Sequence, residues 1–95
     1  MKITADNLRQ AAELIEAKRE TFCCIALAAV LDVSRREYAE CREVTDEFLH
    51  PLLKRDGYST EGEWMKNMSL KAMRQSRIEW LNKIADELEQ AQQAL

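Results

Sequence analysis

The amino-acid sequence predicts an all-α protein, a single small domain over residues 1–95 with four to five helices. Two observations indicate this class. The helix formers Ala, Glu, Leu, Lys and Arg are abundant, whereas only two Gly and one Pro occur. Residues 22–31 carry no charge, hydroxyl, Gly or Pro, and a helix that is apolar all round must be covered all round. We therefore expect an irregular orthogonal bundle around a buried apolar helix at about 21–32, with a long C-terminal helix at about 69–94.

The first helix is predicted to begin at Thr4, a suitable N-cap, with Asp6 in the first turn, where a negative charge suits the helix dipole. One apolar face follows at helical spacing, formed by Leu8, Ala11, Ala12 and Ile15. Lys18 and Arg19 end this helix. The apolar helix then either begins with Thr21 as its N-cap, or continues from the first helix through a bend.

The third helix is predicted from a capping box, Ser34 to Glu37, after the apolar helix stops at Asp32-Val33. Its apolar side contains Tyr38, Cys41, Val44, Thr45, Phe48 and Leu49. Pro51 lacks a backbone donor and disfavours helical geometry at His50, so we expect a kink or break there.

Two further helices follow the turn predicted at Asp56-Gly57. A second capping box, Thr60 to Glu63, opens a short helix around Trp64. Ser69 caps the final helix, which would be roughly 35–40 Å long at about 1.5 Å per residue.

The final helix places two arginines among its apolar residues. Its apolar arc, roughly 160° wide at about 100° per residue, contains Leu70, Met73, Ile78, Trp80, Leu81, Ile84, Ala85, Leu88 and Ala91. Arg74 and Arg77 fall inside this arc. Either their heads reach the edge of the fold or pair with a carboxylate such as Glu40, Glu43 or Glu47, or part of the arc faces a partner.

Charge and composition narrow the functional classes. The net charge is −3 and no basic stripe stands out, so nucleic-acid binding is not favoured. The apolar run is too short to span a bilayer, which takes roughly 20 residues. The N-terminus lacks a signal-peptide layout, and three Cys, two of them adjacent, fit a reducing compartment. We expect a cytoplasmic protein that does not enter a membrane.

No motif in the sequence predicts catalysis or a cofactor. The soft metal ligands are Cys23, Cys24, Cys41 and His50, and adjacent cysteines on a helix point about 100° apart, so they do not readily clamp one ion. We interpret the cysteines as packing residues. His50 has no nucleophile motif around it, and the two Gly form no phosphate loop. The predicted protein is therefore not an enzyme and holds neither a metal nor a cofactor.

Candidate partner-binding residues lie in the C-terminal half: Trp64, Met65, Met68, Arg74 and Arg77. Aromatic residues, Met and Arg are enriched at protein interfaces, although a Met-rich stripe also fills cores. Three alternatives remain open. The long helix could pair with a second copy, because its far end outruns the other helices. A local basic face of Lys54, Arg55, Lys66, Lys71, Arg74 and Arg77 could bind nucleic acid. An enzyme site could be assembled across a dimer.

The stretch Arg19-Glu20-Thr21-Phe22-Cys23-Cys24-Ile25-Ala26-Leu27, followed by a Pro, a Trp and the helix segment from Arg77 to Leu81, resembles small uncharacterised proteins encoded by tailed bacteriophages. The distinctive part is Phe22 to Leu27. The resemblance implies a context in which small accessory proteins bind host proteins, including nucleases and defence complexes. It implies no activity and no functional residue. The expected function is a non-enzymatic interaction module that inhibits or modulates a host protein.

Overall fold

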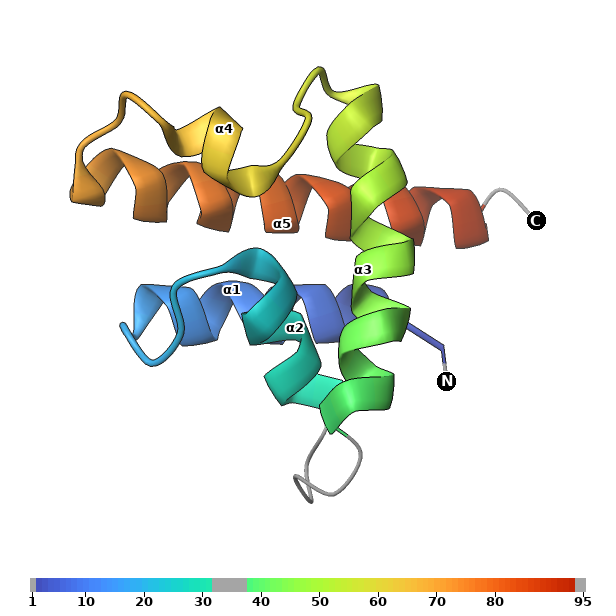
Figure 1. Cartoon of the computed structure of the whole chain (residues 1–95). Helices are drawn as coiled ribbons and strands as arrows, with labels where there is room; N and C mark the ends of the chain where they lie inside the picture. Colours follow the sequence, from blue (N-terminus) through green and yellow to red (C-terminus); the bar gives the residue numbers. More distant parts are fainter. Residues whose placement is uncertain (1, 32–37, 94–95) are drawn as a thin grey trace.

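The computed structural model describes residues 2–31 and 38–93, and all regular structure within them is helical (Figure 1). The helices are α1 (Ala5–Glu16), α2 (Cys23–Leu31), α3 (Tyr38–Arg55), α4 (Glu61–Met65) and α5 (Leu70–Gln93). The predicted all-α class, the five helices and the long C-terminal helix are confirmed. No helix among the described residues combines the length and apolarity needed to cross a bilayer.

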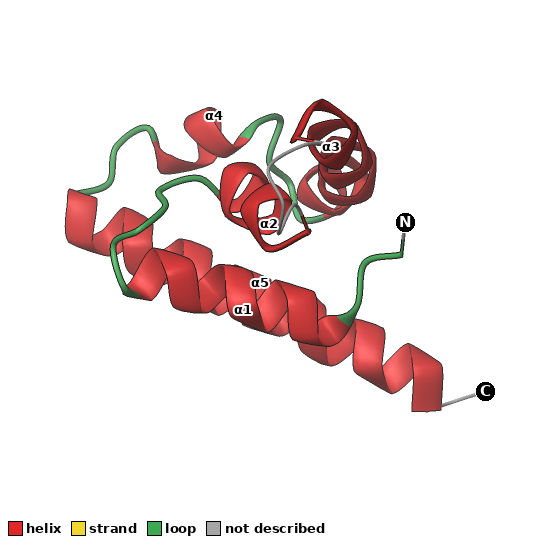
Figure 2. Ribbon diagram, turned by 90° about the horizontal axis from the view of Figure 1, so that it is seen from below, coloured by secondary structure: helices red, strands yellow, loops and turns green. Residues whose placement is uncertain are grey.

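The helices form two layers (Figure 2). The antiparallel pair α1 and α5 makes one layer, and α2, α3 and α4 lie across it in the other. Because α3 crosses α5 at a steep angle, the bundle is orthogonal, as the sequence predicts (Figure 1). The core lies between the layers and draws large apolar side chains from four helices, including Leu8, Ile15, Leu27, Leu49, Leu81 and Ile84.

The predicted cap of α1 is present and is reciprocal. Thr4 Oγ1 accepts from the Asn7 N–H at 3.2 Å, and Asn7 Oδ1 accepts from the Thr4 N–H at 2.9 Å. The predicted apolar face of α1 is buried against the core. Arg9 forms ion pairs with Asp86 and Glu89, which fixes the start of α1 beside the end of α5.

The apolar helix α2 is central but is not covered on every side. Cys23, Ala26, Leu27 and Ala28 are buried, whereas the remaining positions of α2 are half-buried. Phe22 precedes the helix and is 42% exposed, so the prediction that it belongs to a buried hub is wrong. The helices that contact α2 most extensively are α1 and α3. The side of α2 that faces away from both of them is therefore less covered.

The predicted break at Pro51 does not occur, because α3 continues through this residue to Arg55. Pro51 is exposed, and so is Glu47, whose carbonyl would accept the missing hydrogen bond, so water can reach this side of the helix. Leu49 and Leu53 are buried four residues apart and hold both halves of α3 on the core. The capping box at Ser34 lies outside the described residues.

The remaining boundaries follow the sequence closely. Gly57 has φ +93° in the turn that ends α3, a conformation that glycine adopts without strain. Thr60 caps α4 by accepting from the Glu63 N–H at 3.0 Å, and Ser69 caps α5 by accepting from the Ala72 N–H at 3.2 Å. These caps place α4 directly over the first half of α5 (Figure 1).

Candidate functional site

The five predicted partner-binding residues gather where α4 meets the first half of α5, but they do not share one surface. Met65 and Arg77 are buried, with 2% and 4% exposed, and contribute to the fold from inside. Trp64, Met68 and Arg74 are half-buried. Trp64 and Met68 line one pocket, while Arg74 and Arg77 line another. The structure thus divides four of the five predicted residues between two pockets, and Met65 lines neither of them.

Arg77 forms the central ion pair of this region. Its Nε donates to Glu61 Oε1 at 2.6 Å, and the same oxygen accepts from the Cys23 N–H at 2.8 Å. Among the described residues, the carboxylate paired with Arg77 is that of Glu61 on α4, in place of the predicted Glu40, Glu43 or Glu47. One carboxylate on α4 therefore ties α5 to the start of α2. The Phe22 ring also covers the guanidinium, with 4.9 Å between its centroid and Cζ.

The Glu61 carboxylate of this ion pair also affects the thiols of Cys23 and Cys24. Burial, together with the nearby Glu61 carboxylate, raises the pKa of the Cys23 thiol well above its usual range. Burial and Glu61 also raise the pKa of Cys24. The thiolate is the reactive and metal-binding form, and these raised pKa values disfavour it. Within residues 2–31 and 38–93, no three His, Cys, Asp or Glu residues are grouped so that they could hold a metal ion.

The Trp64 side of the region is an aromatic cluster. Tyr58 stacks on Trp64 with 4.5 Å between ring centroids, and Trp64 meets Trp80 edge-on at 5.8 Å. Trp80 Nε1 donates to Asp56 Oδ2 at 2.8 Å. Hydrogen bonds from Arg55 and Trp80, and a further one from Lys83, hold the pKa of Asp56 well below its usual range. A shallow pocket of about 470 Å³ adjoins this cluster, whose polar groups already pair with one another.

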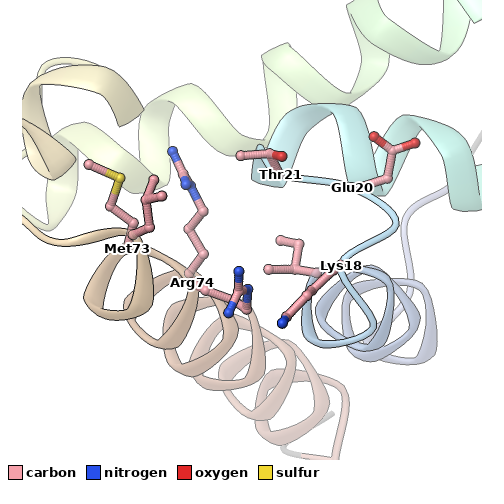
Figure 3. A pocket seen from close by; sticks show the side chains of 8 residues that line it. Lys18, Glu20, Thr21, Met73 and Arg74 are labelled. Carbon is pink, nitrogen blue, oxygen red and sulfur yellow. The ribbon is translucent and has the colours of Figure 1, made fainter.

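The second pocket, which Arg74 and Arg77 line, offers both charged and apolar side chains to a partner protein. A pocket of about 300 Å³ lies between the α1–α2 connection and the first turns of α5, and we call it the α1–α5 pocket. Figure 3 shows Lys18, Glu20 and Thr21 on one wall, with Met73 and Arg74 of α5 on the other. Its lining is completed by Ile15, Leu70 and Arg77.

Two cations in the lining of this pocket form no ion pair with another described residue, and exposed apolar side chains lie in it or beside it. The ion pairs formed by the described residues include neither Lys18 nor Arg74. Leu70 is 78% exposed and Phe22 42% exposed, and these are the exposed large hydrophobic side chains in the described part of the chain. Leu70 lines the pocket, while Phe22 rests on Arg77 of its lining.

The sequence did not indicate the α1–α2 wall of the pocket. Lys18 lies two residues after the end of α1 with φ +61°, a left-handed conformation that a non-glycine residue seldom adopts, and its N–H donates to the Ile15 carbonyl. The end of the apolar face at Ile15, followed by two cations, is the signal that could have located this turn. Leu70 was expected inside the apolar arc of the final helix, but it is exposed at the first position of α5.

The basic face considered for nucleic acid is partly neutralised. Arg55 Nη1 lies 2.9 Å from Glu87 Oε2 and Arg55 also pairs with Asp56. Arg77 is buried against Glu61. Two of its six cations are therefore occupied within the fold, which weakens the continuous positive surface that a phosphate backbone requires.

The fold and the site together define a small helical protein with a cationic, apolar-rimmed pocket. Comparison with protein-family models, curated proteins and solved structures gave no match for this chain.

Proposed function

We propose that this protein is a non-enzymatic protein–protein interaction module. In keeping with its resemblance to phage proteins, we propose that it is an accessory protein that acts in the cytoplasm of a host cell. It would bind a host protein, such as a nuclease or a defence complex, and inhibit or modulate it by covering a functional surface.

The observation that carries this proposal is the exposure of Leu70 and Phe22 around the α1–α5 pocket. Aromatic residues and arginine are enriched at the centres of protein interfaces, where apolar side chains pack beside them. Here Phe22 covers the Arg77 guanidinium, and Leu70 lines the same pocket as Arg77 and the half-buried Arg74. The candidate interface therefore combines apolar anchors with cations.

Affinity purification with quantitative mass spectrometry tests the proposal. Immobilised wild-type protein should retain a specific protein from a bacterial lysate, and the double variant Phe22→Ser/Leu70→Ser should lose it. Ala91→Ser is the matched control, since Ala91 is exposed at the other end of α5. Circular dichroism must show the same helix content for all three proteins. Equal recovery with the wild type and the double variant would contradict the proposed surface.

Self-association is the second candidate, and one feature favours it. The last turns of α5 extend beyond α1 (Figure 2). Near this end a pocket of about 200 Å³ is lined by residues that include Phe48, Leu52 and Leu88. However, the exposed residues beyond it, Gln90 to Gln93, are mostly polar. Light scattering at high micromolar concentration separates the candidates, because a monomeric mass excludes a homodimer through α5.

A further inference from the structure

We infer that the α1–α5 pocket receives an acidic side chain of a partner protein, with a neighbouring apolar side chain of the same segment packed beside it. This inference rests on the proposed function, because it names the chemistry of the segment that the interaction module would bind. The ligand is an internal acidic–apolar peptide segment, and the pocket is its anchor point.

Charge is the first argument. Lys18 and Arg74 line the pocket and form no ion pair with a described residue. Arg77 lines it as well and, among the hydrogen bonds of the described residues, donates from Nε to Glu61 and from no other atom. The buried side-chain atoms without a hydrogen-bond partner in the described part of the chain do not include the Arg77 terminal nitrogens, so Arg77 contributes charge to the pocket rather than an unsatisfied donor. A carboxylate is the group that a guanidinium binds most strongly.

The balance of charges also favours an anion. Against Lys18, Arg74 and Arg77, the pocket has Glu20 in its lining and Glu61 paired with Arg77. One positive charge is left in excess, whereas the whole chain has a net charge of −3. The pocket is thus opposite in sign to the protein that contains it, which favours an acidic ligand over a basic one.

Apolar lining is the second argument. Ile15, Met73 and Leu70 form the apolar wall of the pocket. Ile15 is buried, whereas the Leu70 side chain is exposed. A phosphate or another bare inorganic anion would leave this wall uncovered. An acidic residue brings methylene groups with its carboxylate, and the next apolar residue of the segment can cover Leu70.

Size is the third argument. The volume of about 300 Å³ lies at the lower end of the range of ligand pockets, roughly 300–1,000 Å³. It accommodates one or two side chains rather than a large cofactor. Arg55 is not part of the pocket lining, and it is paired with Asp56 and Glu87. This cation therefore does not extend the positive charge of the pocket toward a nucleic-acid backbone.

The test uses the full-length protein labelled with nitrogen-15 and a blocked probe peptide, acetyl-Leu-Asp-Glu-Leu-Phe-amide. We expect saturable shifts in the backbone amide signals of Lys18, Thr21 and Met73. The isosteric neutral peptide, acetyl-Leu-Asn-Gln-Leu-Phe-amide, should bind at least about tenfold more weakly, because it offers no charge to the cations. Equal binding of the two peptides, shifts confined to other surfaces, or no saturable shift would each overturn the inference.

Matched variants separate contact from long-range attraction. Lys18→Ala/Arg74→Ala should weaken binding of the acidic peptide by at least about tenfold. Arg19→Ala/Lys71→Ala removes the same charge from two exposed residues outside the pocket lining and should change the affinity by less than about twofold. An equal loss in both double variants would overturn the assignment to the pocket.

A third peptide distinguishes the source of the carboxylate. Acetyl-Leu-Asn-Gln-Leu-Phe with a free C-terminal carboxylate should bind no better than its amide. If it alone binds, the pocket recognises a chain end and the inferred side-chain recognition is wrong. If no peptide binds while wild-type protein still retains a partner that Phe22→Ser/Leu70→Ser loses, the proposed function stands and the inferred pocket chemistry is wrong.

Discussion

Replacing Arg77 by Met tests whether the buried ion pair with Glu61 organises the fold. Arg77→Met keeps a long side chain for packing but leaves the Glu61 carboxylate without its cation. The two side chains are 5% and 11% exposed, so water can compensate only slightly. Removing one partner of such a pair typically costs about 3–5 kcal/mol, because a buried charge is left alone. The same carboxylate accepts from the Cys23 N–H, so the start of α2 should loosen as well.

The double variant Arg77→Met/Glu61→Gln provides the critical comparison. The introduced amide carries no charge, and its oxygen could still accept from the Cys23 N–H. We expect the double variant to recover most of the stability that Arg77→Met loses, with a coupling free energy of at least about 2 kcal/mol. A domain of 95 residues is stable by roughly 5–14 kcal/mol, so the single variant should remain measurable.

Urea denaturation followed by circular dichroism and by the fluorescence of Trp64 and Trp80 gives these free energies of unfolding. Lys83→Met is the surface control. Its ion pair with Asp56 involves a lysine side chain that is 54% exposed, so its loss should cost less than about 1 kcal/mol. If Arg77→Met also costs less than about 1 kcal/mol, or if the double variant is no better than the single one, the structural role argued for this pair is wrong.

Four further predictions concern single residues. Leu27→Ala should lower the free energy of unfolding by about 2–5 kcal/mol, because Leu27 is fully buried in α2, and Leu27→Asp should unfold the domain; an unchanged melting temperature would contradict this. Thr45→Val should stabilise the protein by about 1 kcal/mol, because the buried Thr45 hydroxyl has no hydrogen-bond partner among the described residues and Val matches its shape; a loss of stability in urea melts would show that the hydroxyl is bonded. Lys18→Gly should raise the melting temperature by relieving a left-handed conformation worth roughly 1–2 kcal/mol, while reducing peptide binding; a lower melting temperature would argue against strain at this turn. Asp56→Asn should destabilise the protein at neutral pH, and the loss of stability should shrink as the pH falls. The pKa of Asp56 is lowered on folding, so its contribution to stability is complete above its unfolded pKa of about 3.9 and is lost as the pH falls below that value. A stability difference between wild type and variant that does not depend on pH would contradict this prediction.

The local signals in the sequence predicted the helices well. Thr4, Thr60 and Ser69 each cap a helix in the structure, because a capping bond depends on residues three positions apart. The apolar periodicity of the first helix likewise identified its buried face. Such features are set within one turn of chain, and a comparison of neighbouring residues can find them.

The failures have a common physical origin in packing between distant elements. Pro51 was expected to interrupt its helix, but Leu49 and Leu53 bury on the same face and keep α3 on the core. Phe22 was predicted to be buried because it belongs to an uncharged apolar segment. Composition does not show which side of such a segment another helix will cover. These outcomes depend on how five helices cross one another, which local periodicity does not encode.

The partner-binding residues that the sequence singled out stay a prediction. Arg74 and Arg77 are part of the pocket lining in the structure, but the sequence named Glu40, Glu43 and Glu47 in place of Glu61 as carboxylate partners. It also gave no indication of the α1–α2 wall, where Lys18 adopts its left-handed conformation. A pocket formed by segments far apart in the sequence emerges only when α1 and α5 are placed side by side.

Photo-crosslinking tests most directly whether the Leu70 end of the molecule is the interaction surface. A photoreactive amino acid placed at position 70 is compared with one at position 90, an exposed residue at the far end of the same helix. Position 70 should form a covalent adduct with a partner protein in the cells that carry the gene, and position 90 should form none. Adducts from position 90 alone, whether with another protein or with a second copy of this chain, would contradict the proposed surface.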